Sequence, residues 1–149
     1  MTLPKSVTKV TEDGVTFTSS VDRAQYLLVE LQRRALRDVA MFIRKRMIEK
    51  LKKLRGMKKH RRLSSSTQWW VRNRETDLII GFKHNTWYGV LQELGTKNQP
   101  KRDILRSTVF DNIDQIMIIQ GQYLSAIEEE NRALGLIKEV EYLSGEDEE

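Results

Sequence analysis

The residue types most often used as nucleophiles and metal ligands are sparse in this chain, which has two histidines and no cysteine. His60 lies in a basic stretch and His84 at the end of a predicted strand, and neither has an acidic partner at a metal-ligand spacing. The run of Ser64, Ser65 and Ser66 is typical of a linker, and no Gly-x-Ser-x-Gly nucleophile motif or glycine-rich phosphate loop occurs. We therefore predict no catalytic residues, no metal site and no cofactor, and a protein that is not an enzyme.

The clearest local pattern spans residues 87–105. Gly95 can end a short helix in the left-handed conformation, and Pro100 keeps the following polar loop from being helical. Asp103 is predicted to cap a further helix that starts with Ile104 and Leu105. Four apolar residues before Gly95 recur at three- and four-residue steps and predict one face of that short helix: Trp87, Val90, Leu91 and Leu94.

Glu93 is the one acidic residue of that short helix. Its predicted role is structural: it holds the following loop by hydrogen bonds, or by ion pairs with Lys97, Lys101 or Arg102. We favour this role over a catalytic one because the motif contains no cluster of residues suited to catalysis.

The same motif resembles the central motif of a family of small neck proteins of long-tailed double-stranded DNA bacteriophages and prophages. These are known as tail-completion, head–tail joining or minor structural proteins. The family motif is Tyr-Ala-x-x-Val-Glu-x-Gly-Thr, a short loop, and then Pro-x-x-Pro-Phe-Leu-x-Pro-Ala. This chain differs in having Asp103 in place of a proline, Ile104 in place of phenylalanine, and Ser107-Thr108 in place of Pro-Ala. The residues that carry the resemblance are Tyr88, Glu93, Gly95, Thr96, Pro100, Ile104, Leu105 and Arg106.

The resemblance implies a structural virion protein that is made in the host cytoplasm and forms a ring of itself, a hexamer, in the phage neck. Its implied partners are the head connector or stopper protein, the tail terminator or tail-tube protein, and the double-stranded DNA in the channel. The motif would then serve as an interface or docking site, with these residues: Trp87, Tyr88, Glu93, Gly95, Thr96, Lys97, Pro100, Arg102, Ile104 and Leu105.

Charge is distributed unevenly along the chain, whose net charge is +5. Residues 44–62 hold eleven Lys or Arg and one Glu, whereas residues 128–149 hold nine acids and two bases. Two interpretations remain open: both segments are solvated faces, or the basic one contacts DNA or an acidic protein, including the acidic end of this protein. The candidate contact residues are Arg44, Lys45, Arg46, Lys50, Lys52, Lys53, Arg55, Lys58, Lys59, Arg61 and Arg62.

An alternative function follows from that basic segment: a small accessory or regulatory protein that binds nucleic acid through its phosphates. No known DNA-reading or RNA-reading motif accompanies the segment, so recognition of bases is not predicted. Four aromatic residues could stack bases, but such residues are more often found in cores and interfaces: Trp69, Trp70, Trp87 and Tyr88.

The periodicity predicts an α+β fold with a long N-terminal helix, a small antiparallel sheet, a short helix and a second long helix packed on the sheet. One face of the sheet is plainly core, while the other carries Trp70 and Ile79 and is predicted to be covered by a helix or another subunit. The predicted elements are a hairpin of residues 6–10 and 15–18, helices 21–55, 87–96, 103–131 and 132–143, and strands 67–73 and 78–84.

The length predicts one domain, with an apolar content of 39% and a charged content of 32%. No apolar run approaches the roughly 20 residues of a membrane span, so no membrane is expected among the partners. We place an N-terminal arm at residues 1–19, a single α+β domain at residues 20–143 and a disordered acidic tail at residues 144–149.

Overall fold

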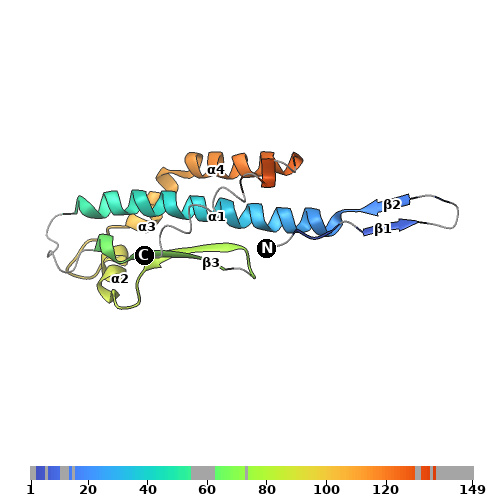
Figure 1. Cartoon of the computed structure of the whole chain (residues 1–149). Coiled ribbons are helices and arrows are strands. Elements are labelled where there is room, and N and C mark those ends of the chain that lie inside the picture. The colour runs from blue at the N-terminus through green and yellow to red at the C-terminus, as the bar shows by residue number, and fades with distance from the viewer. Residues whose placement is uncertain are drawn as a thin grey trace, which may run out of the picture. The chain divides into compact units, whose positions relative to one another are not determined.

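The computed structural model describes residues 3–5, 7–10, 14, 16–54, 63–72, 74–129, 132–134 and 136, and it confirms the predicted α+β fold (Figure 1). Its contacts divide the chain into two units, Met1–Arg34 with Gly121–Glu149 and Ala35–Gln120. The boundaries of the single domain expected above stay a prediction. The elements are β1 (Val7–Val10), β2 (Thr16–Ser19), α1 (Val21–Lys52), η2 (Leu63–Ser65), β3 (Thr67–Arg72), β4 (Asp77–Phe82), α2 (Trp87–Leu94), α3 (Ile104–Asp111), α4 (Ile113–Ser125) and η3 (Ala126–Glu128).

Helix α1 is the longest element and confirms the predicted long helix, although it ends at Lys52. Asp22 lies in its first turn and Lys50 and Lys52 in its last, where each charge opposes the nearer end of the helix dipole. The predicted stop at Gly56 lies outside the described residues. One face of the helix is buried along most of its length, through Leu31, Ala35, Val39, Ala40, Ile43, Met47 and Leu51.

Val39, Ile43 and Met47 form the centre of the core in residues 35–120. The β3–β4 hairpin runs along this part of α1 (Figure 1). Because the sheet and the helices α3 and α4 all pack against these three residues, the second half of α1 is the element on which this unit is built. The partly buried residues around the centre are Phe42, Leu78, Ile80, Phe82, Leu105, Val109, Ile116 and Ile119.

Strands β3 and β4 form the predicted antiparallel sheet, in a register that pairs Trp69 with Ile80. Directly paired residues share a face, so Trp69 lies on the same face as Leu78 and Ile80, which contact α1. Trp70 on the opposite face is 44% exposed. This chain's described helices therefore leave Trp70 largely uncovered, and a covering subunit stays a prediction.

The strand pair next to the turn of this hairpin is an exposed ion pair. Arg72 and Asp77 are cross-strand partners, and the guanidinium donates two hydrogen bonds to the carboxylate. These bonds hold the pKa of the Asp77 carboxyl below its ordinary value. The pair therefore stabilises the hairpin at neutral pH, and this contribution is lost as the pH falls through the lowered pKa. Both side chains are solvated, so the contribution is small.

The prediction of one helix over residues 103–131 is wrong, because the chain breaks between α3 and α4 at Asn112. The Asn112 side-chain amide donates to the Thr108 carbonyl oxygen at 2.7 Å, while its backbone N–H bonds to the Val109 carbonyl oxygen at 3.2 Å. The side chain thus takes the carbonyl that the backbone N–H of a continuous helix would use, which is how asparagine interrupts helices. Of the predicted helix 132–143, residues 132–134 and 136 are described and helical; the rest and the tail lie outside the described residues.

The predicted N-terminal hairpin is confirmed as a separate two-stranded sheet in which Val7 pairs with Ser19. Val7 is 49% exposed, so this residue gives the chain's core little apolar surface. A lone two-stranded hairpin is marginally stable in water, which is consistent with the expectation that it acts as an arm.

We expect Met47→Ala to lower the free energy of unfolding by about 2–5 kcal/mol, because the side chain is fully buried against α1's neighbours. Met41, on the same helix, is 49% exposed, and Met41→Ala is expected to change that free energy by less than about 0.5 kcal/mol. Urea unfolding of both variants measures the difference. Equal losses would contradict this placement of the core.

Candidate docking site

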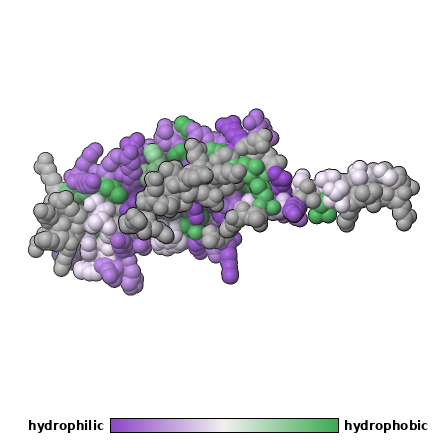
Figure 2. All heavy atoms as spheres, in the orientation of Figure 1, coloured by the Kyte–Doolittle hydropathy of each residue, from purple (hydrophilic) through white to green (hydrophobic). Residues whose placement is uncertain are grey.

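Helix α2 turns its apolar residues outward. They are the four residues predicted to share one helical face, and such a face is normally turned toward the core. Among the coloured residues in Figure 2, hydrophobic patches lie between hydrophilic side chains. Because α2 is only eight residues long, its four exposed apolar side chains form an unusual concentration. Their exposed fractions are 67% for Trp87, 54% for Val90, 39% for Leu91 and 67% for Leu94.

Helix α2 contacts its own unit through a small residue. Gly89 is its one buried residue, and a Cβ there would lie 2.8 Å from Phe82 Cδ2 and 3.2 Å from Leu63 Cδ2. Tyr88, beside it, packs against the buried cluster that contains Leu63 and Ile104. The glycine lets the helix come close to the sheet, and the large apolar side chains are left on the outer side.

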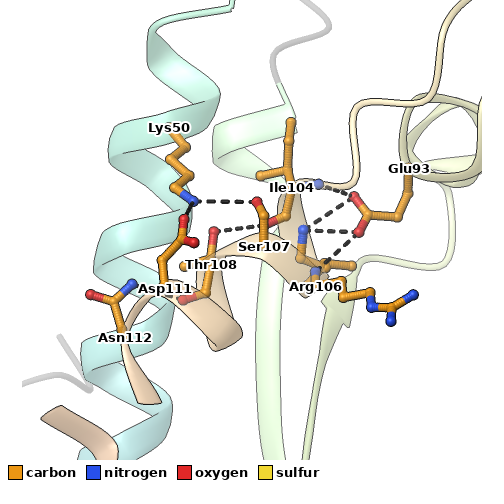
Figure 3. A network of polar contacts seen from close by, with 9 residues as sticks. Lys50, Glu93, Ile104, Arg106, Ser107, Thr108, Asp111 and Asn112 are labelled. Atoms are coloured by element: carbon orange, nitrogen blue, oxygen red, sulfur yellow. Dashed lines mark hydrogen bonds and ion pairs between the residues drawn. The ribbon is translucent and has the colours of Figure 1, made fainter. Parts of the chain in front are cut away.

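The Glu93 carboxylate binds the start of α3 (Figure 3). Its Oε2 accepts a hydrogen bond from the backbone N–H of Ile104 at 2.8 Å, and its Oε1 accepts from those of Leu105 at 2.9 Å and Arg106 at 3.2 Å. These N–H groups have no partner within their own helix, and a negative charge there is favoured by the helix dipole. Glu93 therefore holds α2 and α3 together by the hydrogen bonding that its sequence context predicted, although its donors belong to the helix beyond the loop.

The predicted ion pairs of Glu93 with Lys97, Lys101 and Arg102 do not occur in the described part of the chain. The prediction that Asp103 caps α3 with its side chain is also wrong: Asp103 has a left-handed backbone, φ 49° and ψ 43°, and makes no side-chain cap hydrogen bond. A capping residue normally has an extended backbone, from which its side chain reaches the first turn. Here Glu93 supplies that acceptor, and the Asp103 carboxylate lies 3.4 Å from Lys101 Nζ.

The loop between α2 and α3 is folded tightly against the end of α2. Gly95 has the predicted positive φ, 78°, but its ψ of 168° lies outside the predicted left-handed helical conformation. Its N–H bonds to the Leu91 carbonyl oxygen at 2.9 Å. Thr96 and Gln99 exchange two backbone hydrogen bonds, of 2.8 and 3.1 Å. A Cβ at Gly95 would lie 2.8 Å from the Lys101 backbone nitrogen, so the loop has its present course because this position has no side chain.

The predicted docking residues divide into an exposed group and a supporting group. Trp87, Thr96, Lys97 and Pro100 are exposed and accessible to a partner. The predicted docking set left out Val90, Leu91 and Leu94, although the sequence places them on one helical face. Gly89 on the opposite face could have indicated that the large apolar side chains point away from the core, because the helix packs on its own unit through this small residue. The supporting residues are half-buried or buried: Tyr88, Glu93, Gly95, Arg102, Ile104 and Leu105.

The basic segment has one clearly structural member. Lys50 Nζ lies 2.6 Å from Asp111 Oδ2 and 3.3 Å from Ser107 Oγ, and thereby ties the end of α1 to α3 (Figure 3).

Other basic residues of α1 keep more contact with solvent. Arg46 Nη1 lies 3.3 Å from Glu49 Oε2 on the exposed side of the helix. Arg44, Lys45, Lys52 and Lys53 are exposed, and the first three border a shallow depression with Met41 and Ile48. Five further candidates lie outside the described residues: Arg55, Lys58, Lys59, Arg61 and Arg62.

Among the described residues, no three His, Asp or Glu side chains are grouped so that they could hold a metal ion. No helix in that part of the chain is long and apolar enough to cross a membrane. No protein-family model, curated protein sequence or solved structure matches the chain.

We expect Glu93→Gln to lower the free energy of unfolding by about 1–3 kcal/mol, because it removes the charged acceptor of three helix N–H groups. Asp103→Asn removes a charge from the same helix start but no capping hydrogen bond, and asparagine tolerates the left-handed backbone. Its expected cost is less than about 1 kcal/mol. Chemical denaturation distinguishes them; a larger loss for Asp103→Asn would show that the cap has been assigned to the wrong acid.

The same substitution at two glycines should have opposite effects. Gly95→Ala is expected to destabilise the protein by about 1–3 kcal/mol, because it adds backbone strain and a close contact with Lys101. Gly121 lies in α4 with open space around its Cα, so Gly121→Ala should stabilise the protein by about 0.5–1 kcal/mol. Thermal unfolding gives both signs, and a Gly95→Ala variant of unchanged stability would refute the conformational requirement.

Proposed function

We propose that this chain is a structural protein of a bacteriophage neck, and that it forms a ring that joins the DNA-filled head to the tail. The proposal rests on the resemblance of residues 88–106 to the neck-protein motif. One structural observation supports it most: the motif holds an exposed apolar helix face through the Glu93 hydrogen bonds and the close contact of Gly89 with Phe82. A surface of this kind is suited to docking against protein.

The residues shared with the family motif have roles that fit such a docking element. Glu93 fixes the start of α3, and Gly95 permits the tight loop between the two helices. Neither residue presents chemistry to a substrate. In this proposal they hold the outer face of α2 in a constant orientation, which lowers the entropy cost of binding a partner.

The proposed partners are further copies of the chain in a ring, which the resemblance implies is a hexamer, together with the head connector or stopper on one side and the tail terminator or tail tube on the other. DNA would pass through the channel. The alternative, a nucleic-acid-binding accessory protein, is favoured by the exposed Arg44, Lys45 and Lys52 around one depression. We favour the neck protein because the apolar face of α2 has no role in binding phosphates.

The particles found in a phage lysate that lacks this protein distinguish the two functions. A neck protein acts after the head is filled and beside a tail that is built separately. Its loss is therefore expected to leave DNA-filled or leaking heads together with free tails of normal length, both visible by electron microscopy. Empty heads with unprotected DNA would instead favour a packaging accessory, and joint loss of heads and tails would favour a regulator. Intact, infectious particles without the protein would end the structural proposal.

A further inference from the structure

The outer face of α2 has a basic border at its C-terminal end. Leu94 is followed by the tight turn that carries Lys97, and the Lys101 backbone packs against Gly95. Both lysine side chains are exposed. A segment that fits this surface would therefore have apolar residues along one side and acidic residues at one end.

The chain itself contains a segment of that chemistry. Residues 134–149 carry six acidic residues against one lysine, and four of these acids are the last four residues of the sequence. Three of their apolar members, Ile137, Val140 and Leu143, recur at three-residue steps, as on one face of a helix. Ala133, the residue before this segment, is buried, so the segment starts from a fixed point of its own unit. The thirteen residues from 137 to 149 can extend roughly 40 Å, which is enough to reach a neighbouring molecule.

We propose that the C-terminal segment, residues 134–149, of one copy binds the outer face of α2 in the next copy. Its apolar residues cover Val90 and Leu94, and its acidic end lies against Lys97 and Lys101. Each copy offers one face and one segment, so the contact is head-to-tail and can be repeated around a ring. The ring rests on the proposed neck function, whereas the contact itself is a property of the purified protein.

Two full-length variants test this contact by complementation. Val90→Gln with Leu94→Gln makes the α2 face polar at two exposed positions, and Ile137→Gln with Val140→Gln makes the segment polar. We expect wild-type protein to self-associate with concentration in sedimentation velocity. Each variant alone should associate at least about tenfold more weakly. A mixture of the two should form a one-to-one dimer of wild-type affinity that grows no further, since one intact face meets one intact segment.

Leu124→Gln is the matched control for Leu94→Gln, because Leu124 is 64% exposed on another helix, and it should associate like wild type. Reversing the charge of Lys97 and Lys101 should weaken association, and reversing Glu146 and Glu148 in the partner copy should restore it. A wild-type protein that stays monomeric, a polar-face variant that associates normally, or a mixture without dimers would each overturn the inference. The two proposals can fail separately. If the mixed variants form the dimer, but the lysate lacking the protein still contains infectious particles, the neck function is wrong and the contact between copies is supported.

Discussion

The three hydrogen bonds that the Glu93 carboxylate accepts at the start of α3 are the constraint on which the candidate docking site depends. The first N–H groups of any helix lack hydrogen-bond acceptors within the helix, and here an acid from the preceding helix supplies the acceptors. Since the carboxylate is attached to α2, the same bonds fix the distance between the two helices. The loop between them must then close over a short span, which accounts for the positive φ of Gly95 and the left-handed backbone of Asp103.

With this end of α2 fixed, the close packing of Gly89 on Phe82 sets which side of the helix faces inward. The two contacts together leave the large apolar side chains of α2 exposed. Lys50 adds a further tie by joining α1 to α3 through Asp111 and Ser107, so the base of the site is connected to the helix that carries the core. The exposed face is thus supported by polar contacts and a close glycine approach, and the protein keeps its apolar surface available.

Periodicity was sufficient to predict α1, the β3–β4 hairpin and α2, because each buries or exposes one regular face. The N-terminal hairpin was predicted from alternating residues around an Asp-Gly turn. It could not predict the direction in which the face of α2 points, since an apolar stripe has the same spacing whether it meets a core or a partner. Asp103 was the nearest acid to α3 and was therefore predicted as its cap; Glu93 is ten residues earlier, and only the folded loop brings it there. The break at Asn112 coincides with a side-chain hydrogen bond to the Thr108 carbonyl oxygen, and the spacing of apolar residues carries no information about such a bond.

Amide hydrogen exchange at Ile104, Leu105 and Arg106 tests the central claim most directly. The first N–H groups of a helix without a cap exchange almost as fast as those of an unfolded chain. If the Glu93 carboxylate accepts their hydrogen bonds, these three amides should be protected in the wild-type protein and should lose that protection selectively in Glu93→Gln. Rapid exchange of all three in the wild type, or protection that is the same in the variant, would contradict the account.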